Sequence, residues 1–160
     1  MKIVSIGEMI VSNDKDEVLK TFALGMSVAL IIHDKSNNNY GLVHIALPNA
    51  KVNRKKAQYS PGHFADTAVN ELLKIIKKES MAYKQENIEA KIIGGANVES
   101  LRDTFKIGKR TLLEVKKQLW KHKIHSIRED TGGNISRTVS IDISTGEVIV
   151  SVAGRGEWKI

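Results

Sequence analysis

The segment TFALGMSVALIIHDKSNNNYGLVHIALP, residues 21–48, determines how the middle of the chain folds. It contains two apolar runs, residues 28–33 and 42–47, separated by the polar stretch DKSNNNYG. Aliphatic runs of this length are typical of buried strands, and clusters of Asp, Ser, Asn and Gly form turns. The segment therefore predicts two buried strands joined by a turn. Two polar side chains accompany these runs, Ser27 at the start of the first and His44 inside the second.

On either side of this segment, the pattern of apolar residues predicts further strands and two amphipathic helices. The strands are expected at residues 1–6, 9–12, 18–24, 88–93 and 124–128, with a hairpin over residues 137–152. Apolar residues at helical spacing predict helices over residues 64–80 and 109–122, the second with Leu112, Val115, Leu119 and Trp120 facing inward. Residues 49–62 and 129–134 read as polar loops. This pattern indicates an α+β fold in a single domain, residues 1–160.

Composition limits the class of protein. The chain has 160 residues, of which 41% are hydrophobic and 27% charged, as in ordinary soluble domains. No apolar run approaches the ~20 residues that span a membrane, so we expect a cytoplasmic protein without membrane insertion. The absence of cysteine excludes disulfides and thiolate metal sites, and the five histidines lack HExxH spacing. We therefore expect no metal.

The net charge of +7 raises the question of an anionic partner. Basic residues cluster in KVNRKK (51–56), KIIKK (74–78) and KKQLWKHK (116–123). Binding to single-stranded nucleic acid uses stacking aromatic side chains, but only 5% of the residues are aromatic. We therefore expect no nucleic-acid partner, and interpret the charge as a solvated basic face or as a surface for an acidic protein.

Ser27 and His44 do not reveal a function when each is taken alone. The nucleophile elbow Gly-x-Ser-x-Gly requires glycine where this chain has Ala29. A serine beside glycine is more often a turn residue, and a histidine in an apolar run is more often a hydrogen-bonded core residue. The pairs Gly94–Gly95 and Gly132–Gly133 are usually tight turns, although their N–H groups could also bind an oxyanion.

Seven short motifs in a fixed order carry more information than any single residue. They are IGE (6–8), ALGMSVAL (23–30), GLVHIALP (41–48), PGHFADTAV (61–69), EAKIIGGAN (89–97), IGKR (107–110) and EDTGGNISR (129–137). Together they closely resemble the chemoreceptor glutamine deamidases of the CheD family. The resemblance covers about residues 6–150, whereas the tail AGRGEWKI (153–160) is not clearly covered.

The resemblance implies a catalytic centre of the Cys-His-Thr type. Ser27 falls on the position of the family's cysteine, His44 on its histidine and Thr21 on its threonine, and Met26 replaces a family serine. We expect the Ser27 hydroxyl to hydrogen-bond one ring nitrogen of His44 and Thr21 to contact the other. Further candidates for substrate binding are the glycines Gly25, Gly94, Gly95, Gly132 and Gly133. We expect the pairs Gly94–Gly95 and Gly132–Gly133 to border the same cleft as His44, because glycine lets a substrate backbone approach closely.

The resemblance also implies the fold, the reaction and the partners. The fold would be a three-layer α/β/β sandwich, similar to the cytotoxic necrotizing factor toxins. The reaction would be hydrolysis of glutamine side chains to glutamate on methyl-accepting chemoreceptors in bacterial chemotaxis, without a cofactor. A CheC-type phosphatase would be a second partner that docks over the catalytic region.

Ser27 changes the expected activity. A thiol with a pKa near ~8.5 loses its proton to a neighbouring imidazole far more readily than a hydroxyl does. We therefore expect the family's scaffold with impaired glutaminase activity, or alternatively a non-catalytic module that regulates the CheC phosphatase and the receptors. Ser27 is either an introduced substitution or a natural variation. The second departure, Met26, favours natural variation, whereas the retained His44 and Thr21 leave the other explanation open.

Overall fold

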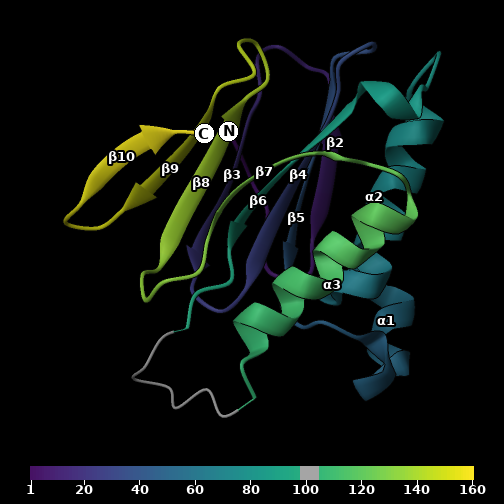
Figure 1. Ribbon diagram of the computed structural model, residues 1–160. Coiled ribbons are helices and arrows are strands. Elements are labelled where there is room, and N and C mark those ends of the chain that lie inside the picture. The colour runs from purple at the N-terminus through teal and green to yellow at the C-terminus, as the bar shows by residue number, and fades with distance from the viewer. Residues whose placement is uncertain (98–104) are drawn as a thin grey trace.

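The computed structural model describes residues 1–97 and 105–160, which form two five-stranded sheets and a layer of helices (Figure 1). The first sheet has the strand order β1 (Lys2–Ile3), β3 (Val18–Leu24), β8 (Arg137–Asp142), β9 (Val148–Val152) and β10 (Gly156–Lys159). The second has the order β2 (Met9–Ser12), β5 (Asn39–Ile45), β4 (Val28–Asp34), β6 (Ile88–Gly94) and β7 (Ser126–Thr131). The helices are α1 (Arg54–Tyr59), α2 (Ala65–Glu79) and α3 (Ile107–Lys121), with 3₁₀ turns η1 (Ala50–Val52), η2 (Pro61–His63) and η3 (Gln85–Asn87).

Strand β4 is apolar throughout because the second sheet is the middle layer. Val28, Leu30 and Ile32 belong to the core between this sheet and the helices. The alternate residues Ala29 and Ile31 belong to the core between the two sheets. A strand covered on both faces needs apolar side chains on both, which is why the sequence shows a continuous run instead of alternation.

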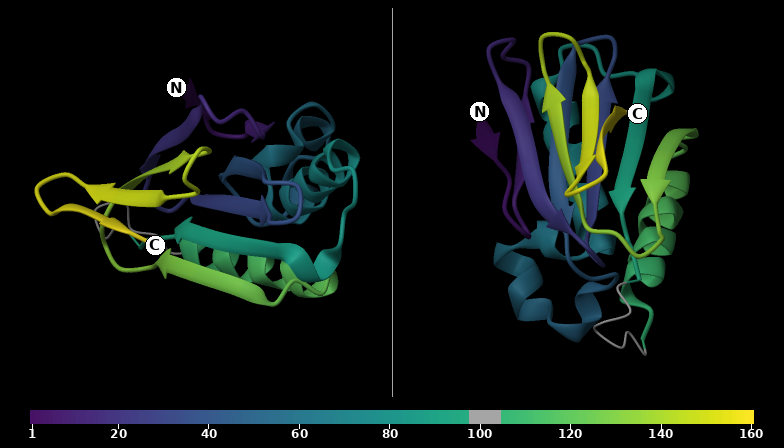
Figure 2. Two further views of the ribbon diagram at one scale, coloured as in Figure 1. Left: turned by 90° about the horizontal axis from the view of Figure 1, so that it is seen from above. Right: turned by 90° about the vertical axis from the view of Figure 1, so that its left-hand side faces the viewer.

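Helices α2 and α3 cover the face of the second sheet that the first sheet leaves open (Figures 1 and 2). Helix α2 buries one stripe of aliphatic residues, which includes Val69, Leu72 and Ile76. Gly41 lets this helix approach β5 closely, since a Cβ at Gly41 would lie 2.8 Å from Leu72 Cδ1. The predicted α+β fold with three layers, α/β/β, is therefore confirmed.

Several local predictions were wrong. Residues 49–62 are not an irregular loop, because η1, α1 and η2 lie within them. Strand β7 continues to Thr131, where a loop was expected, and the first strand is confined to Lys2–Ile3. Trp120 does not face inward, and 65% of its surface is exposed. Among the described residues, no helix is long and apolar enough to cross a membrane.

Candidate active site

His44 and Thr21 face each other across the space between the two sheets. On β5, Val43 and Ile45 point toward the helices, so the alternation of side chains turns His44 toward the first sheet. On β3, Thr21 points inward and is 1% exposed, while His44 is 5% exposed. The site is therefore assembled by the packing of one sheet on the other.

Ser27, His44 and Thr21 form one chain of hydrogen bonds. His44 Nε2 lies 2.8 Å from Ser27 Oγ, and His44 Nδ1 lies 2.8 Å from Thr21 Oγ1. The Thr21 hydroxyl donates its proton to the Val4 carbonyl oxygen at 2.6 Å, so it can only accept from His44 Nδ1–H. This fixes the neutral tautomer with its free lone pair on Nε2, where it accepts the Ser27 hydroxyl proton. The predicted contacts among the three residues are present, and their catalytic role stays a prediction.

Ser27 is held by the backbone of the turn between β3 and β4. Ala23 has a positive φ of 57°, and the ladder between β3 and β8 shifts register after Thr21. The carbonyl oxygen of Gly25 accepts from Ala96 N at 2.8 Å, and that of Ser27 accepts from Gly95 N at 2.9 Å. Both sides of Ser27 are thereby attached to the segment that follows β6.

Burial and, to a smaller extent, the nearby charge of His63 lower the pKa of His44 from 6.5 to about 4. The imidazole is therefore neutral at pH 7 and free to accept a proton. Its partner at Nδ1 is a hydroxyl, which stabilises an imidazolium less than a carboxylate would.

The three side chains open onto a cleft of about 370 Å³. Its rim is apolar, with Ile3, Ile6 and Phe22 exposed by 45%, 54% and 44%. The remaining lining residues are Val4, Ser5, Thr21, Ala23, Ser27 and His44. Large exposed apolar side chains around a polar centre are typical of a surface that binds another protein.

The lining of the cleft at Ser27 and His44 does not include Gly94, Gly95, Gly132 or Gly133, so the expectation that the two glycine pairs border it was wrong. A Cβ at Gly94 would lie 2.4 Å from the Ser27 carbonyl oxygen, so this glycine makes room for the turn that carries Ser27. Gly95, Gly132 and Gly133 line a separate cleft together with Asn97, Lys106, Lys109 and Leu112. Gly132 N bonds to the Gly94 carbonyl oxygen at 2.9 Å, and this contact holds the two glycine pairs beside each other.

Two glycines that support His44 are not marked by any pattern in the sequence. The backbone N–H of Gly7 donates to the His44 carbonyl oxygen at 2.7 Å. Gly62 then packs on Gly7, where a Cβ would lie 2.4 Å from the Gly7 carbonyl oxygen. The motifs IGE and PGHFADTAV contain these glycines, but only the fold shows that they meet behind His44.

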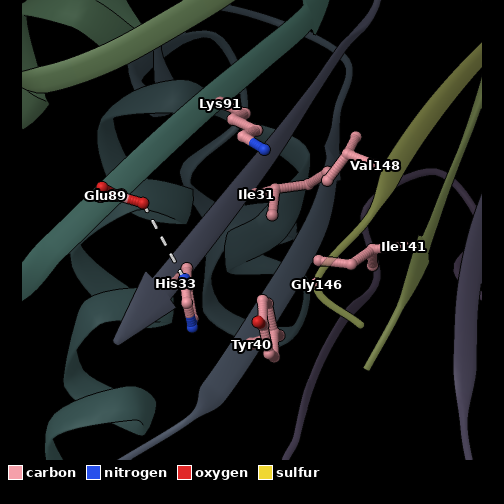
Figure 3. A pocket seen from close by; sticks show the side chains of 8 residues that line it. All are labelled: Ile31, His33, Tyr40, Glu89, Lys91, Ile141, Gly146 and Val148. Carbon is pink, nitrogen blue, oxygen red and sulfur yellow. Dashed lines mark ion pairs between the residues drawn. The ribbon is translucent and has the colours of Figure 1, made fainter. Parts of the chain in front are cut away.

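A second group of polar side chains lies between the sheets, away from Ser27 (Figure 3). His33 stacks on Tyr40 with ring centroids 4.0 Å apart, and Lys91 Nζ donates to the Ile160 carbonyl oxygen at 2.8 Å. The cavity has about 20 Å³, which accommodates about one water molecule. It is therefore too small for a side-chain amide. In residues 1–97 and 105–160, no group of three His, Asp or Glu side chains could hold a metal ion.

Comparison with known proteins shows which sequences and structures the chain is similar to. Residues 46–152 match the family model described as CheD chemotactic sensory transduction. The chain is 43% identical over 158 residues to the "Probable chemoreceptor glutamine deamidase CheD" of Syntrophotalea carbinolica, covering 99% of this chain and 98% of that protein. It is 38% identical over 156 residues to the "Chemoreceptor glutamine deamidase CheD" of Thermotoga maritima, covering 98% and 94%. A crystal structure of the hypothetical protein YfiH of Bacillus licheniformis aligns with a TM-score of 0.46 at 11% identity, covering 76% of this chain and 49% of that one.

Proposed function

The chain belongs to the CheD family, and we propose that it is the scaffold of a glutamine deamidase that acts on chemoreceptors. The proposed catalytic residues are Ser27 as the nucleophile, His44 as the base and Thr21 as the residue that orients His44. The hydrogen-bond chain from Thr21 through His44 to Ser27 is the observation that carries this assignment.

The reaction would proceed in two steps. The nucleophile attacks the side-chain carbonyl carbon of a glutamine while Nε2 of His44 takes its proton. The C–N bond then breaks, the protonated His44 returns a proton to the leaving nitrogen, and ammonia departs. Water attacks the resulting acyl-enzyme with His44 again as base, which releases glutamate and restores the nucleophile.

Ser27 is a poor nucleophile for this mechanism. A base whose conjugate acid has a pKa of about 4 removes a proton from a hydroxyl far less readily than from a thiol with a pKa near ~8.5. The imidazolium is also paired with a hydroxyl instead of a carboxylate. We therefore propose that this chain has little glutaminase activity and that a cysteine at position 27 would supply it.

The same cleft would receive protein partners. Chemoreceptors are the proposed substrate, and a CheC-type phosphatase is proposed as a second partner over the same region. The exposed side chains of Ile3, Ile6 and Phe22 support this proposal, because they place apolar contacts around Ser27.

The test compares the chain with its Ser27→Cys variant on purified receptor fragments. Mass spectrometry detects the small mass increase from glutamine to glutamate. We expect the variant to deamidate the fragment at least about a hundredfold faster, with a change in stability below ~1 kcal/mol because one atom changes. Adding His44→Ala should abolish the gain, since the two groups act together. If the variant binds the fragment and leaves every glutamine intact, the protein is a binding module and not an enzyme.

A further inference from the structure

The positive charge of the protein is concentrated in its helices. Helices α1, α2 and α3 together contain eleven Lys or Arg residues and four Asp or Glu residues. Their excess of seven positive charges equals the net charge of the whole chain, +7. The remainder of the chain therefore has equal numbers of basic and acidic residues. Electrostatic attraction would bring an anionic partner toward the helical layer.

The segment from η1 to α1 contains basic residues and no acidic residue. It carries Lys51, Arg54, Lys55 and Lys56, and no acidic residue occurs between positions 49 and 65. In the part of the chain that the structure describes, the ion pairs involve other residues. The next carboxylate along the chain, Asp66, accepts a hydrogen bond from Ala50 N at 2.9 Å. Among the described residues, none of these four cations forms an ion pair with a carboxylate.

This basic segment lies at the same end of the molecule as Ser27. Strand β4 begins at Val28, which pairs with Ile45 at the end of β5, and η1 and α1 follow β5 directly (Figures 1 and 2). The turn η2 after α1 then packs on Gly7 behind His44, with Ser60 Oγ 3.4 Å from the Gly7 carbonyl oxygen. Burial and, to a smaller extent, the charge of Lys56 lower the pKa of His63, and the charge of His63 in turn contributes to the lowered pKa of His44.

The surface of α1 is not used to build the core. None of its residues is buried. Tyr59 is 74% exposed, and Val52 in the neighbouring turn η1 is 66% exposed. Arg and Tyr are enriched among residues that contribute most to protein interfaces. Helix α1 therefore offers cations and an aromatic ring to a partner while contributing little to folding.

We infer that the segment Lys51 to Tyr59 is a docking element for an acidic stretch of the protein substrate. Carboxylates near the target glutamine would pair with Lys51, Arg54 and Lys55 while the glutamine enters the cleft at Ser27. This inference rests on the proposed function, and it adds that glutamines in acidic surroundings are the preferred targets.

The test measures binding of a purified receptor fragment to the chain as it stands, with Ser27 in place. The variant changes Lys51, Arg54 and Lys55 to Gln, all three being exposed. The control changes Lys74, Lys78 and Lys117 to Gln, three exposed lysines on α2 and α3. We expect the first variant to weaken binding about tenfold in low salt and the control less than about twofold. Equal losses in both variants, unchanged binding in the first, or a fragment that does not bind at all would overturn the inference.

Additional probes separate other anionic partners from an acidic protein. The fragment with its glutamates changed to Gln should bind the parent chain about as weakly as the original fragment binds the variant. Stronger binding to phosphatidylserine vesicles or duplex DNA than to the fragment, with the same dependence on these three residues, would assign the segment to a membrane or to nucleic acid instead. The single change Arg54→Gln, with a salt titration, repeats the measurement if the triple variant unfolds.

Kinetics distinguish this inference from the proposed activity. In the Ser27→Cys protein, removing the three charges should raise KM about tenfold and leave kcat within about twofold. An active Ser27→Cys protein with an unchanged KM would refute the docking element and leave the deamidase intact. A fragment that binds through the three residues but is never deamidated would refute the deamidase and leave the docking element.

Discussion

Thr21 is the residue on which the orientation of His44 depends. Its hydroxyl accepts from Nδ1 of His44 and donates to the Val4 carbonyl oxygen, so it defines which ring nitrogen carries the proton. It belongs to the first sheet, whereas His44 belongs to the second. One hydroxyl thus connects the chemistry to the packing of the sandwich.

We expect Thr21→Val to reduce deamidation by the Ser27→Cys protein about a hundredfold while substrate binding is unchanged. The valine has a similar shape but leaves His44 Nδ1–H without its acceptor and the Val4 carbonyl oxygen without its donor, so the tautomer needed for a free Nε2 is no longer favoured. Steady-state kinetics measure the effect on kcat. The change Thr21→Ser restores the hydroxyl and should restore most of the rate. Equal activity in the valine and serine variants would show that Thr21 only fills space.

His44 should also make the stability of the protein depend on pH. Its pKa is 6.5 in an unfolded chain and about 4 in the folded protein, so between these values the unfolded state binds more protons. The contribution of this group is fully present above pH 6.5 and is lost as the pH falls toward 4. His33, His63 and His122 also have lowered pKa values, so a comparison with a variant is needed.

The variant His44→Gln isolates this effect. Between pH 7 and pH 4.5 the parent should lose about 2 kcal/mol more stability than the variant, because only the parent gains a proton on residue 44 when it unfolds. Urea denaturation at the two pH values measures the difference. The same pH dependence in both proteins would contradict the burial of a neutral His44.

At the scale of elements, the turn before β4 and the segment after β6 form one unit. Gly94 has a φ of 108°, and its missing side chain leaves room for the Ser27 carbonyl oxygen. Gly108 at the start of α3 packs on the same segment, since a Cβ there would lie 2.6 Å from the Ala96 carbonyl oxygen. The glycines of EAKIIGGAN and IGKR therefore hold the turn of Ser27, the segment after β6 and the start of α3 together through close backbone packing.

We expect Gly94→Ala to destabilise the protein by more than about 2 kcal/mol and to reduce the activity of the Ser27→Cys protein. The added Cβ combines an unfavourable φ with a clash against the backbone of Ser27. Gly132→Ala is the matched control, because Gly132 has a φ of 78° and a Cβ there would meet nothing within 4 Å. The control should cost only about 1 kcal/mol. Thermal unfolding checks both, and equal costs would mean that the clash at Ser27 is relieved by a small shift.

Elements that follow from hydrophobic periodicity were predictable from the sequence, and those that depend on contacts were not. The sequence shows the apolar runs of β4 and β5 and the apolar stripe of α2 directly, because these residues form the core. Helix α1 buries none of its residues, so no pattern marks it except Asn53, whose side chain accepts from Lys56 N. Trp120 follows the inward Leu119 directly, and periodicity does not define the edge of an apolar face.

The candidate site shows the same division. Ser27 and His44 were noticed as polar residues in apolar surroundings, but their pairing depends on the register of β4 and β5, in which Ala29 lies opposite His44. The resemblance to a family supplied the pairing, because residues 21, 27 and 44 lie on different segments. The supporting role of Gly7 and Gly62 follows only from contacts between segments that are distant in the sequence.

At the scale of the whole molecule, the site depends on how the two sheets are held together. Asp130 on β7 of the second sheet forms an ion pair with Arg137 on β8 of the first, with Oδ1 and Nε 3.0 Å apart. Arg137 is 4% exposed and also donates to the Gly132 carbonyl oxygen at 2.9 Å. Trp158 of the C-terminal strand β10 donates to the second carboxylate oxygen of Asp130. The motif EDTGGNISR and the tail thus meet at a single carboxylate that joins the sheets.

Asp130→Ala should be strongly destabilising, by roughly 3–5 kcal/mol, because it leaves the Arg137 guanidinium buried without its counter-charge. For a chain of this size the melting temperature should fall by about 10 °C. Glu147→Ala is the control, since it breaks the exposed ion pair with Lys159 and should cost less than about 1 kcal/mol. Adding Arg137→Met to Asp130→Ala should recover part of the loss, because the unpaired charge is then removed as well. Circular dichroism at increasing temperature measures the unfolding of the parent and of the three variants. If Asp130→Ala and Glu147→Ala have the same melting temperature, the contact between the sheets is stabilised by their apolar core alone, and the ion pair contributes only specificity.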